Sequence, residues 1–400
     1  MTPGTPGRLH GRPGFAVAAY AFAAAMLGTT LPTPLYALYQ RRYGFSELII
    51  TVIFATYAVG VIAALLFSGR ISDEMGRRPV LLAGLGLSAL SAAAFLLARS
   101  LALLLVGRIL SGLSAGIFTG TATATLVDLM GAERSGSATL GAAVANMGGL
   151  GLGPLLSAAV ATAAAPLHLP FWVDLVLLAP AVVAIILIRE PVTTTRRPRL
   201  RPQKLAVPAD MRPAFIRSGL AGFAGFAVLG LSTAVSPAFL GRTLGVRSLI
   251  VVGAVVFSVF AASTAGQVVL ERIPSRWAMP TGCGALITGM ALLAGGLAAS
   301  SLALLVTGAV IAGSGQGLSF RAALGQVNAQ APPDRRGEVT SSFFVVCYVA
   351  ISLPVIGEGV LAEIAGLRVA GLVFAGVVAA IAAVVLVLLA RQQSEPPSAA

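Results

Sequence analysis

The chain has 400 residues, of which 57% are hydrophobic and only 10% are charged, and its mean hydropathy is +0.93. Soluble globular domains carry about 25% charged residues, so this composition excludes an ordinary soluble domain and fits a protein whose solvent is largely lipid. The formal net charge of +13 would favour nucleic acid as a partner in a soluble protein. Here little water-facing surface remains for such a groove, and no nucleic-acid partner is expected.

The residue types that metalloenzymes and histidine-based catalysts need are scarce. The two cysteines, Cys283 and Cys347, both lie inside apolar runs, and the two histidines are His10 and His168. None of them lies in a cluster with metal-ligand spacing, and no acid, histidine and nucleophile group together. We therefore expect no metal, no cofactor and no enzymatic activity.

Twelve apolar runs are long enough to cross a membrane as helices, which takes about 20 residues each. Open strands are excluded, because lipid offers no partner for unpaired backbone groups. The first run lacks the short apolar core and cleavage site of a signal peptide, so it is taken as a span. The predicted spans are 14–38, 46–68, 79–98, 101–128, 138–163, 170–188, 214–238, 248–270, 277–299, 302–328, 339–363 and 367–390.

The placement of positive charge predicts the orientation of the chain. With the N-terminus in the cytoplasm, 19 of the 27 Lys and Arg residues fall in cytoplasmic segments and 6 in outer segments, while Arg108 and Arg321 lie within spans. This asymmetry favours a multi-pass protein of the cytoplasmic (inner) membrane with both termini in the cytoplasm.

The loop between spans two and three carries a dense cluster of charge. It reads "GRISDEMGRRP" over Gly69–Pro79 and must be a tight turn, because too few residues separate the two spans for a domain. Its glycines allow unusual dihedral angles, and its proline suits the first turn of the next helix. Asp73 and Arg77 are four residues apart, so they can pair on a helical turn.

This loop resembles the signature of the major facilitator superfamily, Gly-x-x-x-Asp-x-x-Gly-Arg-Arg/Lys. The resemblance implies a conformational latch that holds the cytoplasmic side closed, with an aspartate at the inner end of span four as a further member. The matching residues of this chain are Gly69, Asp73, Gly76, Arg77, Arg78 and Asp128.

Span four contains an arginine in the sequence "LVGRILSGLSAG". An arginine within a span is costly and usually faces a cavity or a partner. At 1.5 Å per residue Arg108 lies about 10 Å into the span, so snorkelling to the outer headgroups is the alternative. The span is similar to a family motif, linked to proton transfer, in which arginine precedes Gln-Gly. Here Ser111 replaces the glutamine and is a cavity candidate, while the resemblance implies a coupling role for Arg108.

Span five, with "NMGGLGLGPLLSA", has small residues that let a neighbouring helix approach and a proline that kinks the helix. A dinucleotide-binding fingerprint is excluded, because no strand precedes these glycines. The span is similar to the antiporter signature of the family, Gly-x-x-x-Gly-Pro-x-x-Gly-Gly, in Gly149, Gly153 and Pro154. Ser157 and Ala158 replace its last two glycines. Within the family this motif marks exporters, so it favours efflux.

The longest polar interval divides the chain into two halves. Residues 1–188 are expected to form one six-helix bundle, 189–213 a basic cytoplasmic linker, and 214–400 a second six-helix bundle with its tail. The linker is either a solvated connector or a patch for anionic lipid headgroups. Gly112 and Gly116 recur 201 residues later as Gly313 and Gly317, so the fold class is an all-α integral membrane protein of two pseudo-symmetric bundles.

The second half carries weaker versions of these signals. Its counterpart of the charged loop, "GQVVLERIPSR" from Gly266, lacks the acid at the matching place, so we expect it to latch weakly or not at all. Span ten is polar where the resemblance implies a cavity lining, and Arg321 there is either a substrate contact or an interface residue. The cavity candidates are Tyr20, Ser111, Ser232, Gln316 and Arg321.

Proton coupling requires a carboxyl group within the membrane, and few are available. Asp174 lies one turn into span six, where an acid near a helix N-terminus is favourable in itself. Glu358, near the outer end of span eleven, is the better coupling candidate, and a position at headgroup level is its alternative interpretation. A uniporter or another coupling ion stays open.

These features predict a secondary transporter that works by alternating access. The leading hypothesis is proton-coupled efflux of drugs or amphipathic metabolites, and the alternative is an uptake carrier for a sugar or an organic acid. A membrane enzyme and a non-transporting sensor are less favoured. The expected partners are a small-molecule substrate, the lipid bilayer and, with coupling, protons, and the chain is expected to be a monomer.

Overall fold

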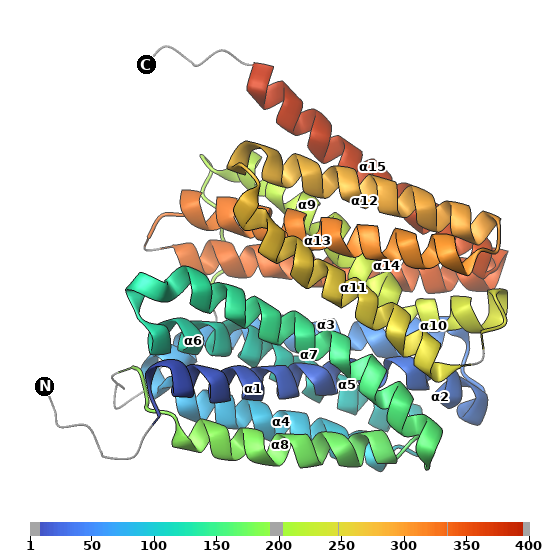
Figure 1. Cartoon of the computed structure of the whole chain (residues 1–400), viewed down its shortest axis with the longest axis horizontal. Helices are drawn as coiled ribbons and strands as arrows, with labels where there is room; N and C mark the ends of the chain where they lie inside the picture. Colours follow the sequence, from blue (N-terminus) through green and yellow to red (C-terminus); the bar gives the residue numbers. More distant parts are fainter. Residues whose placement is uncertain (1–8, 193–202, 247, 334, 395–400) are drawn as a thin grey trace, which may run out of the picture. The chain divides into compact units, whose positions relative to one another are not determined.

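The computed structural model describes residues 9–192, 203–246, 248–333 and 335–394, and these residues form an all-helical protein (Figure 1). Twelve helices in these ranges are long and apolar enough to cross a membrane, as predicted. Within these ranges the one β-type pairing outside the helices is an isolated bridge between Leu9 and Ile188. Residues 1–8 of the predicted first bundle, residues 193–202 of the predicted linker and residues 395–400 of the predicted tail lie outside the described residues.

Residues 9–192 of the first half contain eleven helical elements. They are α1 (Gly11–Thr30), η1 (Thr33–Leu35), α2 (Tyr36–Tyr43), α3 (Glu47–Met75), α4 (Arg77–Leu96), α5 (Leu101–Ile117), η2 (Phe118–Ala122), α6 (Thr123–Met130), η3 (Ala132–Arg134), α7 (Ser135–Ala163) and α8 (Leu169–Leu187).

The described part of the second half contains nine helical elements. They are α9 (Arg212–Ala234), α10 (Ser236–Ala238), η4 (Phe239–Thr243), α11 (Leu249–Val269), η5 (Leu270–Arg272), α12 (Ser275–Ala298), α13 (Leu302–Gln330), α14 (Arg336–Ala365) and α15 (Leu367–Ser394).

The helices group into two compact units. The N-terminal unit comprises Met1–Tyr43 and Thr56–Lys204, and the C-terminal unit comprises Gly44–Ala55 and Leu205–Ala400. The start of α3 therefore belongs to the C-terminal unit, where Glu47 forms an ion pair of 2.5 Å with Arg242 of η4.

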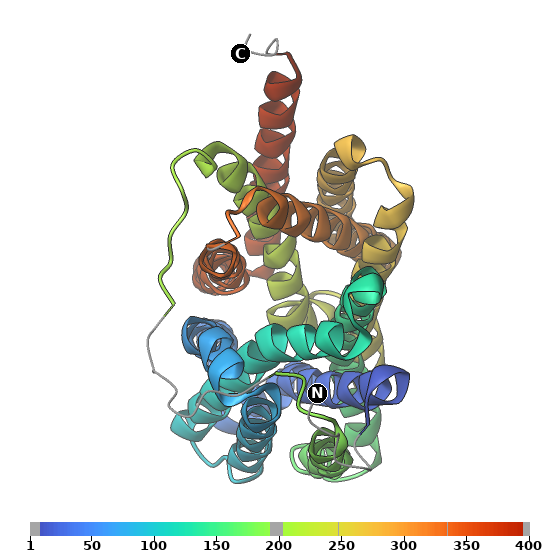
Figure 2. The same cartoon turned by 90° about the vertical axis from the view of Figure 1, so that its left-hand side faces the viewer.

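Small residues let the helices of the N-terminal unit pack closely. In this unit α1 contacts α7 and α8, and α4 contacts α5 and α8; Figure 2 shows α8 nearly end-on beside α4. A Cβ atom at Gly60 of α3 would lie 2.8 Å from the backbone nitrogen of Leu113 in α5. Larger residues would force this helix pair apart. In lipid the hydrophobic effect does not drive helices together, so close packing through small residues such as glycine holds them in contact.

Two predicted spans are interrupted near equivalent places. Span one breaks after Thr30, where Pro32 and Pro34 follow, and span seven breaks after Ala234, before Pro237. Each proline lacks the N–H that would continue the helical hydrogen bonds, so the carbonyl four residues earlier loses its helical donor. Span four also departs from a regular helix, because a π-helical turn, η2, separates α5 from α6.

Candidate functional site

A buried arginine meets the break of span one in the N-terminal unit. Arg108 of α5 is 2% exposed, and its Nη1 donates a hydrogen bond of 2.6 Å to the carbonyl oxygen of Thr29. Its guanidinium carbon lies 4.7 Å from the ring centroid of Tyr57 in α3, a cation–π contact that is strongest where water is excluded. Arg108 faces protein partners in this structure, which agrees with the first of its two interpretations.

A buried carboxyl group reaches the same turn of α1 from another helix. Asp174 of α8 is 3% exposed, and its Oδ1 has no hydrogen-bond partner. Its Oδ2 lies 2.8 Å from the position that a Cβ atom would take at Gly28. A side chain at position 28 would displace this carboxyl group, which lies against the α1 backbone.

The predicted helix-packing motif of span five also contacts this part of α1. A Cβ atom at Gly149 would collide with the Ala23 carbonyl oxygen, and one at Gly153 would lie 2.5 Å from Thr30 Oγ1. Thr30 Oγ1 donates a hydrogen bond of 2.7 Å to the Leu150 carbonyl oxygen. Pro154 lies inside α7. Three helices, α5, α7 and α8, thus hold the last turn of α1 before its break.

The break of span seven repeats the sequence of the break of span one. Thr29-Thr30-x-x-Thr33-Pro34 recurs 203 residues later as Ser232-Thr233-x-x-Ser236-Pro237, and an aromatic residue follows each proline at the second position. This pattern was readable in the sequence, but it becomes meaningful only where both segments are seen to interrupt a helix.

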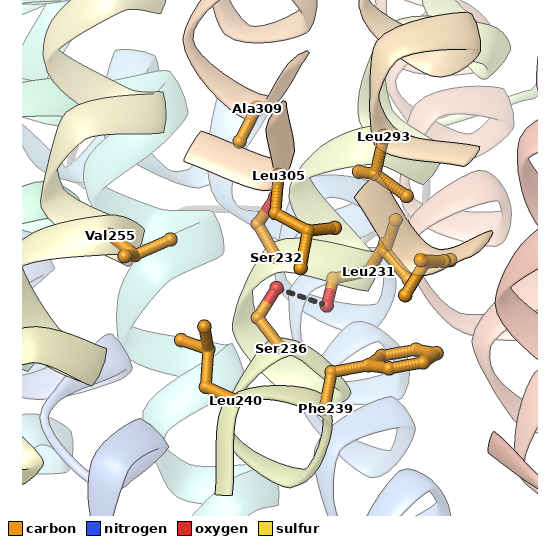
Figure 3. Close-up of a pocket in the computed structure, with 10 residues that line it drawn as sticks. Leu231, Ser232, Ser236, Phe239, Leu240, Val255, Leu293, Leu305 and Ala309 are labelled. Carbon is orange, nitrogen blue, oxygen red and sulfur yellow. Dashed lines mark hydrogen bonds between the residues drawn. The ribbon is translucent and has the colours of Figure 1, made fainter. Parts of the chain in front are cut away.

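The break of span seven borders an apolar cavity within the C-terminal unit (Figure 3). The cavity has a volume of about 30 Å³, which is room for a few heavy atoms. The Ser232 and Ser236 hydroxyls donate to carbonyl oxygens of their own helical segment, at 2.8 Å to Val228 and 3.5 Å to Leu231. The lining residues are Leu231, Ser232, Ser236, Phe239, Leu240, Val255, Leu293, Leu297, Leu305 and Ala309.

The internal repeat places different residues beside the two helix breaks. Arg108 and Ala309 are 201 residues apart, the same spacing as Gly112 and Gly313. In the N-terminal unit the long Arg108 side chain reaches the broken helix, whereas in the C-terminal unit the methyl group of Ala309 lines the apolar cavity.

The predicted latch residues come together around Arg77. Its Nη1 lies 2.6 Å from Asp73 Oδ1 and donates to Ser72 Oγ at 2.7 Å, while its Nε lies 3.2 Å from Asp128 Oδ2. The Asp73 pair spans the turn between α3 and α4, not a single helical turn as predicted. Gly76 provides that turn with a φ of 100°, a conformation that favours glycine.

A carboxylate that the sequence did not single out completes this end of the unit. Glu190 accepts hydrogen bonds from the backbone N–H groups of Arg77 and Arg78 at 2.7 and 2.9 Å. The Arg78 side chain in turn donates to the carbonyl oxygens of Ile185, at 3.1 Å, and Ile186 at the end of α8. Glu190 therefore caps the start of α4 while Arg78 caps the end of α8. Gly69 lies in α3, and nothing about its surroundings is described.

The second unit forms an ion pair near the loop that lacks the signature acid. Arg321 of α13 lies 3.1 Å from Glu271 and also donates to the Gln267 carbonyl oxygen. Of the two interpretations of Arg321, these contacts favour an interface residue. The signature acid would stand at position 270, which is a leucine, and the pairing acid is the next residue, Glu271. Its partner Arg321 comes from another helix, α13, so the spacing within the loop did not reveal the pair.

The other candidates are scattered through the two units. Tyr20 is 39% exposed and its hydroxyl donates to the Leu177 carbonyl oxygen at 2.8 Å. Ser111 is buried without a partner for its hydroxyl. Gln316 is fully buried and its Oε1 accepts a bond of 2.5 Å from the Ser263 hydroxyl. Glu358 is 3% exposed, and neither of its carboxyl oxygens has a partner. Across the described ranges, no three His, Cys, Asp or Glu side chains group as a metal site.

Comparisons with known proteins point to one family. The family model described as "Major Facilitator Superfamily" matches residues 15–355. The multidrug resistance protein MdtL of Escherichia coli O45:K1 (strain S88 / ExPEC) is 38% identical over 89 residues, which are 22% of this chain and 23% of the relative. MdtL of strain O139:H28 (E24377A / ETEC) is 37% identical over the same length. The match spans about a quarter of these curated relatives.

Solved transporter structures share the fold of nearly the whole chain. The human organic anion transporter MFSD10 (TETRAN) is 19% identical with a TM-score of 0.68, over 96% of this chain and 100% of that one. A bacterial homolog of the human lysosomal transporter Spinster, in an inward-facing and unoccupied conformation, is 16% identical with a TM-score of 0.74, over 96% and 98%. At such identities the likeness concerns the fold.

Proposed function

The chain belongs to the Major Facilitator Superfamily, and on that premise we propose that it exports small hydrophobic or amphipathic molecules in exchange for protons. Transport proceeds by alternating access between the two six-helix halves. The protein lies in the cytoplasmic membrane as a monomer with both termini in the cytoplasm. The observation that carries the export direction is the partial sequence match to a multidrug resistance protein.

Two features of the molecule support this proposal, one for the exchange mechanism and one for the class of substrate. The span-five motif that resembles the antiporter signature packs against α1 through Gly149 and Gly153. The cavity beside Ser232 in the C-terminal unit is lined almost entirely by aliphatic and aromatic side chains, and an apolar cavity favours an apolar part of a ligand over a charged one.

The cluster around Arg77 is the latch of the cytoplasmic side. Arg77 is 12% exposed at its side chain, while Asp73 and Asp128 are 63% and 34% exposed. Partly exposed ion pairs each contribute less than about 1 kcal/mol, so this latch is weak enough to open and close during a transport cycle.

Drug accumulation tests the direction of transport. Cells that lack the protein are compared with cells that express it, with chloramphenicol as an uncharged probe and ethidium as a cationic one. Export predicts higher accumulation and greater susceptibility without the protein. Lower accumulation without the protein would overturn export and support the uptake of a sugar or organic acid, which labelled glucose and lactate then test.

Inside-out membrane vesicles test the coupling. An imposed pH gradient, acidic inside, should drive uptake of the exported probe, and vesicles without the protein serve as the control. Uptake that is equal with and without the gradient would remove proton antiport while leaving transport itself in place.

A further inference from the structure

Three helix ends meet at one end of the N-terminal unit, opposite the end that carries Arg77. Here α2 and α4 end and α8 begins. The Tyr43 hydroxyl at the end of α2 donates a hydrogen bond of 2.7 Å to the carbonyl oxygen of Ala98, just after α4. Phe95 of α4 stacks on Phe171 of α8 at a centroid distance of 5.0 Å. These contacts hold the three ends of the helices side by side.

Basic side chains gather at these three ends. Arg41 and Arg42 lie in the last turn of α2, Arg99 follows α4 and His168 precedes α8, and all four residues are exposed. Arg42 and Arg99 are each next in sequence to one of the two residues that the interhelix hydrogen bond joins. Their flexible side chains are therefore close enough to reach one ligand. We call Arg41, Arg42 and Arg99 the arginine patch.

No acidic side chain balances the arginine patch. Across the described residues, none of its three members forms an ion pair. The carbonyl ends of α2 and α4 attract arginines, but a helix end carries only about half an elementary charge. Within the described part of the N-terminal unit, the acidic residues lie towards the Arg77 end, except one that is buried within α8. They are Asp73, Glu74, Asp128, Glu133, Glu190 and the buried Asp174.

The C-terminal unit supplies partners for its arginines in the predicted outer segments. Arg242 lies 2.5 Å from Glu47, and Arg368 donates a hydrogen bond of 2.5 Å to the Ser300 hydroxyl; Arg247 lies outside the described residues. Positive residues are concentrated in the cytoplasmic segments of membrane proteins. Three arginines together in outer segments, without an acid of the protein beside them, therefore point to an anion from outside the chain.

The surface beside the arginine patch is apolar. Leu97, which ends α4, is 67% exposed, and Trp172 in the first turn of α8 is 57% exposed. Val176, one turn further along α8, is 69% exposed. Exposed tryptophans are typical of the level at which lipid headgroups meet the acyl chains. A partner that fits both features has an anionic head beside the arginines and an apolar chain beside α4 and α8.

We propose that the arginine patch binds the phosphate headgroup of an anionic phospholipid. Guanidinium groups bind phosphate oxygens through paired, charge-assisted hydrogen bonds. The headgroup joins the end of α2 to the end of α4. Since α2 is the part of span one that follows its break, the lipid fastens this broken segment to the rest of the N-terminal unit. In the orientation proposed above, the lipid belongs to the outer leaflet.

Lipid binding to the purified, full-length protein in detergent tests the inference independently of transport. Native mass spectrometry and thermal unfolding compare phosphatidylglycerol with phosphatidylcholine of the same acyl chains. Phosphatidylglycerol should bind more tightly and raise the melting temperature more. Arg42→Gln and Arg99→Gln should each lower its affinity about fivefold, the factor that corresponds to about 1 kcal/mol for one arginine at a membrane surface. Equal affinities of the wild-type protein for the two lipids would overturn the inference.

The double variant tests whether the two arginines hold the same headgroup. Arg42→Gln combined with Arg99→Gln should lose less than the product of the two single effects, about 25-fold, because side chains that share one ligand are coupled. A loss equal to that product would indicate two independent contacts and overturn the shared site.

A matched pair of variants separates the arginine patch from the overall charge. Arg272→Gln combined with Arg276→Gln removes two exposed arginines of the C-terminal unit and should leave the affinity for phosphatidylglycerol unchanged. An equal loss in this control would show that net charge alone attracts the lipid. Sodium phosphate at millimolar concentration serves as a soluble anion. If it raises the melting temperature as much as phosphatidylglycerol does, the patch binds a free anion and the assignment to a lipid is wrong.

A variant that keeps every arginine guards against a fold damaged by the loss of charge. Tyr43→Phe removes the hydroxyl that bonds to the Ala98 carbonyl oxygen. It should lower the affinity for phosphatidylglycerol while the helical circular dichroism stays at the wild-type value. Wild-type affinity in Tyr43→Phe would contradict a site that depends on the joined ends of α2 and α4.

Discussion

The cap that Glu190 provides for α4 yields a prediction with a calculable size. The first turn of a helix leaves its N–H groups without helical partners. In α4 the N-cap Gly76 supplies no side-chain bond and Pro79 has no N–H, so the donors of Arg77 and Arg78 depend on the two oxygens of Glu190. Loss of a side-chain cap costs about 0.5–2 kcal/mol.

Glu190→Ala removes both acceptors, so we expect the first turn of α4 to lose about 1–2 kcal/mol of protection, near the upper part of that range. Such a change raises the population of the open turn about 5- to 30-fold. Amide hydrogen exchange of peptides covering 77–82, in the purified protein, should accelerate by this factor. Glu190→Gln keeps one acceptor oxygen and should give an intermediate rate.

The matched control is Glu133→Ala, which removes an exposed acid from the short η3 turn. Exchange at 77–82 should be unchanged in this variant. If Glu190→Ala exchanges at the wild-type rate, or if both variants accelerate equally, the cap contributes nothing and the argument from the two hydrogen bonds is wrong.

Three further predictions concern packing, the cavity and the latch. Gly153→Ala should lower the melting temperature relative to Gly148→Ala. The new methyl group at position 153 would lie 2.5 Å from Thr30 Oγ1, whereas one at position 148 would meet nothing within 4 Å. Overpacking of this kind costs about 1–3 kcal/mol, and equal melting temperatures of the two variants would refute the argument. Ala309→Leu should fill the apolar cavity and weaken binding of the transported drug in equilibrium titrations, whereas Ala303→Leu, at an exposed position of α13, should not. Arg77→Lys keeps the charge but loses the planar guanidinium that joins Ser72, Asp73 and Asp128. We expect about 1 kcal/mol less stabilisation of the closed latch, measured as about fivefold faster labelling of a cysteine introduced at position 74. An unchanged labelling rate would count against the latch.

The membrane architecture was predictable because it follows from local composition. A span is a continuous apolar stretch, and each of the twelve predicted runs overlaps a helix of the structure. The family resemblance was also predictable, since the signature residues of the loop at 69–79 lie within eleven positions of one another. The Asp73–Arg77 pair followed from the same short spacing and was confirmed at 2.6 Å.

The candidate site was less predictable, because its members are far apart in sequence. Nothing near Glu190 indicates that it caps a helix more than 100 residues earlier, and nothing near Glu271 indicates its pairing with Arg321. From the sequence, Asp174 was interpreted as an acid that is favourable near a helix N-terminus, whereas in the structure it is buried against Gly28. Such contacts are set by which helix faces meet.

The sequence by itself thus determined how many helices are long and apolar enough to cross a membrane, where the charged loop at 69–79 lies and which family the chain belongs to. Hydrophobicity and short motifs are properties of neighbouring residues. Only the tertiary structure decided which ionisable groups are buried and which residues from distant helices line the cavity beside Ser232. The energy of a buried charge depends on partners that folding brings from distant helices, and no local pattern records them.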